Sequence, residues 1–149
     1  MVDFKTILVP VDFSDHSAEA LDHAIGVAQK FGAKLHLLHC YPINPGGIAP
    51  YGIVLPDGFE REIRLAATQH LEEWSEKAKG EGLEVSISLT PLFPSRAIAE
   101  EANEIGADLV VMSTHGHTGI KHALLGSVAE RTLRVAPCPV LTVKARESH

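Results

Sequence analysis

The residues whose types and spacing best suit ligand chemistry form a small, polar, glycine-rich loop. This loop lies between an apolar run and a helix-like pattern. The apolar run ends at Met112, and the loop continues to Gly126 and Ser127. Small residues let a backbone approach a ligand closely, and a helix that opens there directs N–H groups and the positive end of its dipole toward that ligand. This chemistry suits a phosphate group. The spacing is neither that of a P-loop nor the G-x-G-x-x-G of a dinucleotide fold.

A carboxylate stands at a comparable point near the start of the chain. The β-branched run from Thr6 to Val11 is typical of a strand buried on both faces, and Asp12 follows it directly. Parallel sheets bind ligands at the carboxyl ends of their strands, where the strand order reverses. If the first and fourth strands are neighbours, Asp12 and the loop 113–126 line one crevice. An acid opposite a phosphate site suits a nucleotide, with its ribose or a magnesium ion between them.

The elements that must position these residues alternate between short apolar runs and amphipathic stretches. We expect strands over 6–11, 35–40, 85–89, 109–112 and 139–143. We expect helices from a Ser14 cap to Gly32, over 59–80, from a Ser95 cap to Gly106, and over 127–135 with Ser127 as the cap. The segment 41–58, with four prolines and four glycines, is expected to be a long loop. The alternation predicts an α/β fold with a parallel sheet covered on both faces.

Composition narrows the class of protein further. A chain of 149 residues with 45 % hydrophobic and 21 % charged residues is typical of one globular domain, which we place over 1–149. A net charge of −6 argues against nucleic acid as a partner. The sequence has no apolar run of about 18 residues and no signal-peptide pattern, so we expect no membrane span. The two cysteines form no disulfide framework, which favours a cytoplasmic location.

Three stretches of the chain resemble the universal stress protein family. They are KTILVPVDFSDHSAEAL, LLHC and ADLVVMSTHG…LLGSVAERTLRVAPCPVLTV, and the resemblance covers nearly the whole chain. It implies a single-domain, open five-stranded parallel sheet of the Rossmann-like, adenine nucleotide alpha hydrolase-like type. Family members that bind ATP carry G-x-x-G, nine residues and then G-[ST]. Gly116, Gly126 and Ser127 match that motif, but Ser113 replaces its first glycine and His117 stands where many binders carry Arg or Lys. We therefore expect weakened or altered binding.

The resemblance implies a role for each matching residue. Val11 and Cys40 would flank an adenine, with backbone groups of Val11 reading its edge, and Asp12 would bond the ribose hydroxyls or support Mg²⁺. Met112 and Ser113 would lie along the nucleoside. The phosphates would be held by backbone N–H groups of Gly116, Gly126, Ser127 and Val128 and by the Ser127 hydroxyl. The complete set expected to bind ATP or a related adenine nucleotide is Pro10, Val11, Asp12, Cys40, Met112, Ser113, His115, Gly116, Gly126, Ser127 and Val128.

Two long loops flank the predicted crevice, and they suggest how a protein of this kind acts. We expect a nucleotide-dependent sensor or regulator in a stress response, without catalytic residues. Bound nucleotide would order the loops 41–58 and 113–125, and an unidentified protein partner would read the ordered surface. The last strand, 140–143, is the expected homodimer edge, because an uncovered strand offers unpaired backbone groups to its twin.

Several alternatives stay open at this point. Asp12 and Ser127 could serve only as helix caps, and the glycines only as turn residues. His115, His117 and His122 could bind zinc or copper, although no cysteine or carboxylate stands at a conventional ligand spacing. A slow ATPase is possible if Asp12 positions magnesium and water, but the sequence has neither S-G-G-x-D-S nor H-I-G-H, and no G-x-S-x-G. Alternatively, Ser113 and His117 mark a lost site in a module that binds only proteins.

Overall fold

One parallel sheet of five strands organises the molecule. In the computed structural model, which describes residues 1–41, 56–116 and 125–144, the strand order is β3-β2-β1-β4-β5. The strands are β1 (Thr6–Pro10), β2 (Lys34–Cys40), β3 (Val85–Thr90), β4 (Leu109–Ser113) and β5 (Val140–Val143). The five expected strands are confirmed to within a residue or two at their ends. The order also meets the condition set above, because β1 and β4 are neighbours and the order reverses between them.

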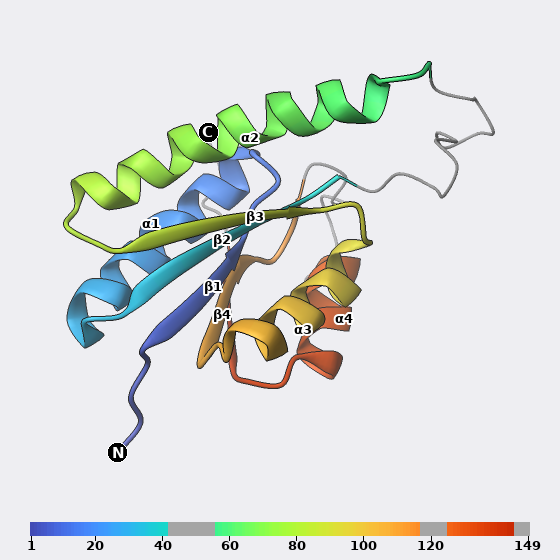
Figure 1. Cartoon of the computed structure of the whole chain (residues 1–149). Helices are drawn as coiled ribbons and strands as arrows, with labels where there is room; N and C mark the ends of the chain where they lie inside the picture. The colour runs from blue at the N-terminus through green and yellow to red at the C-terminus, as the bar shows by residue number, and fades with distance from the viewer. Residues whose placement is uncertain (42–55, 117–124, 145–149) are drawn as a thin grey trace, which may run out of the picture.

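Among the described residues, four helices cover the two faces of this sheet (Figure 1). They are α1 (Asp15–Phe31), α2 (Phe59–Gly80), α3 (Pro94–Ile105) and α4 (Ser127–Val135). The helices α1 and α2 pack on one face, and α3 and α4 pack on the other. Side chains of successive strand residues point to opposite faces of the sheet. Ile7 and Val9 therefore belong to the core beneath α1 and α2, and Leu8 belongs to the core beneath α3 and α4. The predicted doubly covered parallel α/β fold is confirmed.

The helix ends follow local chemistry, with two corrections to the prediction. Ser14 caps α1 as expected, since its hydroxyl accepts from the N–H of Ser17, and Gly32 ends the helix at φ 66°. The expected cap at Ser95 is wrong. Helix α3 begins at Pro94 with Phe93 in the cap position and no side-chain cap bond, because proline already holds the first helical φ. The expected cap at Ser127 is also wrong, since Gly126 is the cap and Ser127 is the first helical residue.

The amino ends of β1 and β4 are held together by one carboxylate. Asp108 Oδ2 accepts from the backbone N–H groups of Lys5 at 2.9 Å and Thr6 at 3.0 Å. The Asp108 N–H in turn donates to the Thr6 carbonyl at 2.8 Å. The strands then pair through Ile7 with Leu109 and Leu8 with Val110. The register of the two strands that lead to the predicted crevice is therefore set at the opposite end of the sheet.

Some predicted features fall partly or wholly outside the described residues. Most of the long loop 41–58 does, as do His117 and His122 of the glycine-rich loop. Within the ranges 1–41, 56–116 and 125–144, no helix is both long and apolar enough to cross a membrane.

Candidate functional site

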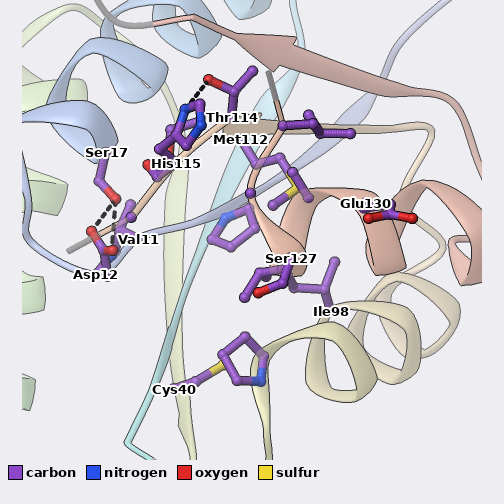
Figure 2. A pocket seen from close by; sticks show the side chains of 18 of the residues that line it. Val11, Asp12, Ser17, Cys40, Ile98, Met112, Thr114, His115, Ser127 and Glu130 are labelled. Atoms are coloured by element: carbon purple, nitrogen blue, oxygen red, sulfur yellow. Dashed lines mark hydrogen bonds between the residues drawn. The ribbon is translucent and has the colours of Figure 1, made fainter. Parts of the chain in front are cut away.

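A cavity of about 490 Å³ opens at the carboxyl ends of β1 and β4, where the strand order reverses. Figure 2 shows side chains from both strand ends and from α3 and α4 surrounding it. All eleven residues proposed from the sequence line it: Pro10, Val11, Asp12, Cys40, Met112, Ser113, His115, Gly116, Gly126, Ser127 and Val128. The chain thus brings together residues that lie more than a hundred positions apart in the sequence.

The Asp12 carboxylate is held in place by the first turn of α1. Its Oδ1 accepts from the Ser14 N–H at 3.0 Å, from the Ser14 hydroxyl, and from the Ser17 hydroxyl at 2.7 Å. The Ser17 oxygen also accepts from the Asp12 N–H at 3.0 Å. Charge-assisted bonds of this kind are short and strong. They orient the carboxylate at the wall of the cavity, where Figure 2 shows Asp12 beside Ser17.

Gly116 lies directly against this carboxylate. A Cβ atom at Gly116 would stand 2.4 Å from Asp12 Oδ2, closer than real Cβ contacts allow. Glycine at this position therefore permits the close approach of the β4 loop to the acid after β1. Because the two loops meet here, any group bound between them contacts both.

The β4 loop is braced by its own side chains. The Ser113 hydroxyl donates to the His115 carbonyl at 2.8 Å, and Thr114 Oγ1 lies 3.0 Å from His115 Nδ1. The serine that replaces the first motif glycine therefore directs its hydroxyl into the loop. Ser113 still lines the cavity. Its side chain occupies space that a glycine would leave free, while its backbone N–H is kept.

Gly126 has a different role from the one expected. Its N–H donates to the Thr114 carbonyl at 2.7 Å, so this group is engaged within the protein and does not serve as a phosphate donor. A Cβ atom at Gly126 would stand 2.6 Å from the same carbonyl oxygen. The φ of Gly126, −67°, suits any residue, so backbone conformation does not require glycine here. The close backbone contact does. A bulky residue at Gly126 would displace the loop that contains Thr114.

The amino end of α4 forms one wall of the cavity through Ser127 and Val128. The N–H groups of a first helical turn have no acceptor within the helix, and the helix dipole places positive charge there. Both features favour a phosphate group. Glu130, in the same turn, also lines the cavity and is paired with Arg134 at 2.8 Å on the outer face. This carboxylate adds negative charge beside the amino end of the helix.

The rest of the lining is mostly apolar and was not predicted from the sequence. Leu38, Pro94 and Ile98 lie among these additional residues, as do Ser17, Thr114, Leu125, Ala129 and Glu130. Ile98 lies within the expected third helix, and nothing in a linear pattern shows that α3 packs beside the end of β1. Burial raises the pKa of the Cys40 thiol to about 12. The thiol therefore stays protonated at neutral pH and serves as an apolar contact.

The backbone of Val11 is already engaged on both sides. Its N–H donates to the Leu38 carbonyl at 2.8 Å, and its carbonyl accepts from His39 Nδ1 at 2.8 Å. The Val11 N–H is therefore engaged within the protein, and the second lone pair of the carbonyl is the backbone group that this residue can still offer to a ligand. His39 is thus a hydrogen-bonded polar side chain near the end of β2. Burial lowers the pKa of His39, so the neutral form is favoured.

Phe13 carries the loop after Asp12 in an uncommon conformation. It has a φ of 65°, in the left-handed region. Its ring stacks on His70 of α2 with centroids 4.1 Å apart and lies 4.3 Å from the His39 ring. The edge of Trp74 completes the contact at 5.4 Å. Packing from α2 and β2 thus holds the conformation that directs Asp12 toward the cavity.

The described residues do not assemble a metal centre of their own. No group of three or more His, Cys, Asp or Glu side chains could hold a metal ion in the part of the chain that the structure describes. The rings of His115 and His16 lie 6.4 Å apart by their centroids. Asp12 and Glu130 are the two carboxylates in the cavity lining and could support a cation that arrives with an anionic ligand.

Comparison with known proteins identifies the family. The model of the universal stress protein family matches residues 3–144. The chain belongs to this family. A universal stress protein of Methanocaldococcus jannaschii, MJ0531, is 34 % identical over 144 residues, which cover 95 % of this chain and 82 % of that one. The universal stress protein YxiE of Bacillus subtilis is 34 % identical over 149 residues, which cover 95 % and 99 % of the two chains.

Solved structures give the same result for the fold. The structure of the protein MJ0577 has a TM-score of 0.85 and 27 % identity, covering 99 % of this universal stress protein and all of that chain. A universal stress protein solved in complex with cAMP has a TM-score of 0.70 and 28 % identity, covering 97 % and 99 %. The Rossmann-like parallel sheet inferred from the sequence is thus shared with other universal stress proteins of known structure.

Proposed function

We propose that this universal stress protein binds an adenine nucleotide, with ATP as the expected ligand, and regulates a stress response through the bound state without catalysing a reaction. One observation carries the proposal. The carboxylate of Asp12, held by Ser14 and Ser17, meets the glycine of the β4 loop at the mouth of a 490 Å³ cavity. The amino end of α4 forms another wall of the same cavity.

The three parts of a nucleotide match three regions of the lining. The apolar region around Leu38, Ile98 and Cys40 suits a flat purine ring. Asp12 suits the ribose hydroxyls, because an oriented carboxylate accepts two hydrogen bonds well. The first turn of α4, with the Ser127 hydroxyl, suits a phosphate group. Mg²⁺ would neutralise phosphate charge beside Asp12 and Glu130, and these are the residues we expect to face it.

The relatives support the ligand class. One structural neighbour at 28 % identity is a universal stress protein in complex with cAMP, an adenine nucleotide. The choice of ATP for this chain rests on the match of Gly116, Gly126 and Ser127 to the ATP-binding motif. Because Ser113 departs from that motif, we expect an affinity lower than that of a full match.

Titration calorimetry of nucleotide-stripped protein with magnesium ATP tests the proposal. Asp12→Ala is the test variant, and Asp15→Ala is its matched control, because Asp15 is an exposed carboxylate at the start of α1 that does not belong to the described cavity lining. We expect saturable binding by the parent and by Asp15→Ala, and at least about a tenfold loss in Asp12→Ala, since one charge-assisted hydrogen bond contributes about 1.5–3 kcal/mol. Parallel titrations with AMP and cAMP show which phosphate length is preferred.

The same samples distinguish the alternatives. ADP that accumulates with time would support a slow ATPase, whereas intact ATP supports a binding protein. Absence of heat and of any thermal shift with ATP, AMP and cAMP would contradict the proposal and favour a module that binds only proteins. A ligand at a hundred times its Kd stabilises the fold by about 2.7 kcal/mol, so the thermal shift is readily measured.

A further inference from the structure

Four polar side chains form a continuous hydrogen-bonded chain at the β3 edge of the sheet. Ser86 Oγ lies 2.6 Å from His36 Nδ1, and His36 Nε2 lies 3.0 Å from Ser88 Oγ. The Ser88 hydroxyl donates to Glu101 Oε2 at 2.6 Å. Among the described residues that line the nucleotide cavity, none of these four is included. The cluster is therefore a separate feature with its own chemistry.

The direction of each hydrogen bond follows from the carboxylate at the end of the chain. Ser88 gives its only hydroxyl hydrogen to Glu101, so toward His36 it can only accept. The proton of neutral His36 therefore lies on Nε2, and Nδ1 carries a lone pair. The only hydrogen available between Nδ1 and Ser86 is then that of the Ser86 hydroxyl. The imidazole is thus oriented as a proton acceptor for Ser86.

Strand register produces this arrangement without a motif that reads along the sequence. His36 on β2 and Ser86 on β3 are direct Cα partners, and Ser88 follows Ser86 on the same face of β3. Glu101 reaches the pair from α3, with its Oε1 3.8 Å from His36 Nε2. His36 is 8 % exposed, whereas Ser86 is exposed on the edge strand. A buried, oriented base therefore contacts the hydroxyl of an exposed residue.

Burial favours the neutral form of His36. Burial is the largest influence and lowers the pKa of His36, and the charge of Lys34 lowers it further. Glu101 and Glu104 on α3 act in the opposite direction without reversing the shift. At neutral pH the ring can therefore accept a proton. A nucleophile bonded to a base that a third group orients is the arrangement found in nucleophilic catalysis.

We propose that Ser86 is a nucleophilic serine that accepts acyl groups from small activated esters, with His36 as its general base. Ser86 Oγ attacks the carbonyl carbon while its proton passes to His36 Nδ1. The bond from that carbon to the leaving oxygen breaks, and the leaving group departs with the electron pair. His36 then releases the proton to water, so the products are the Ser86 ester, the leaving-group anion and one proton. Ser88 and Glu101 are positioning residues that hold the imidazole and stabilise its charged form.

The test uses p-nitrophenyl acetate with the full chain, following p-nitrophenolate by absorbance and the acetylated peptide by mass spectrometry. We expect one acetyl group on Ser86 per chain and a release phase that Ser86→Ala abolishes. His36→Gln should slow acetylation about 100-fold or more, the usual contribution of a general base. With the parent protein, the acetylation rate should rise with pH and level off once His36 is neutral, with a midpoint below its ordinary value of about 6.5.

Clear results would overturn the proposal. Acetylation of Ser86 no faster than that of other serines would do so, as would unchanged release by folded Ser86→Ala. Circular dichroism verifies folding, and Ser86 is exposed, so its replacement is expected to leave the fold intact. If His36→Gln does not fold, the pH profile of the parent decides the role of His36. An acetylation rate that keeps rising in proportion to hydroxide concentration up to about pH 9 would exclude His36 as the base. Free thiols and amines have their pKa values in about this range, so such a profile would point to them or to hydroxide instead.

Discussion

Replacing Gly116 with alanine tests the contact between the two loops of the proposed nucleotide site. A Cβ atom would lie 2.4 Å from Asp12 Oδ2, whereas ordinary contacts lie at 3.4–4 Å. The carboxylate must therefore move by about 1 Å. Because the Ser17 hydroxyl at 2.7 Å and the Ser14 N–H at 3.0 Å hold its other oxygen, Oδ1, this movement would weaken or break at least one of those two bonds.

The energy follows from those bonds. Losing one charge-assisted hydrogen bond costs about 1.5–3 kcal/mol, which corresponds to roughly 3–12 °C in Tm for a chain of this length. Nucleotide affinity should fall by about tenfold or more if Asp12 contacts the ligand. Ser17→Ala removes one of the same bonds, so the double variant should lose less stability than the sum of the two single variants.

Gly26→Ala is the matched control, because Gly26 lies inside α1 and a Cβ there would meet nothing within 4 Å. It should raise stability by about 0.5–1 kcal/mol through its helix propensity. Urea unfolding and calorimetry with magnesium ATP measure both effects. If Gly116→Ala is as stable as the parent and binds equally well, the argument from close approach is refuted.

Three further predictions concern other parts of the fold. Thr132→Val should raise the free energy of unfolding by about 1 kcal/mol in urea titrations, because the Thr132 hydroxyl is fully buried without a partner among the described residues. A loss of stability would show that the hydroxyl is hydrogen-bonded. Burial lowers the pKa of His39, so folding stability should fall as pH drops below about 6.5, and His39→Gln should flatten that slope between about pH 7.5 and pH 5.5. If β5 is the homodimer edge, Leu141→Lys, at a side chain 40 % exposed, should convert the dimer to monomer in sedimentation experiments, and an unchanged dimer would place the interface elsewhere.

The fold could be predicted because each element carries its own signal. Ser14 and Gly32 bound α1 as expected, since both act through bonds made within a few residues. The expectations for Ser95 and Ser127 failed for a related reason. Serine is a common cap, but Pro94 and Gly126 stand next to these residues and decide where the helices begin. Local competition of this kind depends on backbone geometry that the residue types only partly specify.

The site was predictable as a set of residues and less so as a set of contacts. The joint pattern of Asp12 and the glycine-rich loop predicted residues that the structure places around one cavity. The engagement of the Gly126 N–H by Thr114 could not be foreseen, because that bond depends on how the loop folds back on itself. The contribution of Ile98 was missed because it depends on where α3 packs, a property of the tertiary arrangement.

The hydrogen bonds between Asp108 and the amino end of β1 matter for any transfer of this site to another protein. Strand residues rise about 3.3 Å each, so a slip of a single position between β1 and β4 would break the close contact between Asp12 and Gly116. The alignment of the proposed binding residues thus depends on Asp108 at the opposite end of the sheet, whose carboxylate accepts from the N–H groups of Lys5 and Thr6. A graft that copies only the cavity lining would omit the residue that sets its alignment.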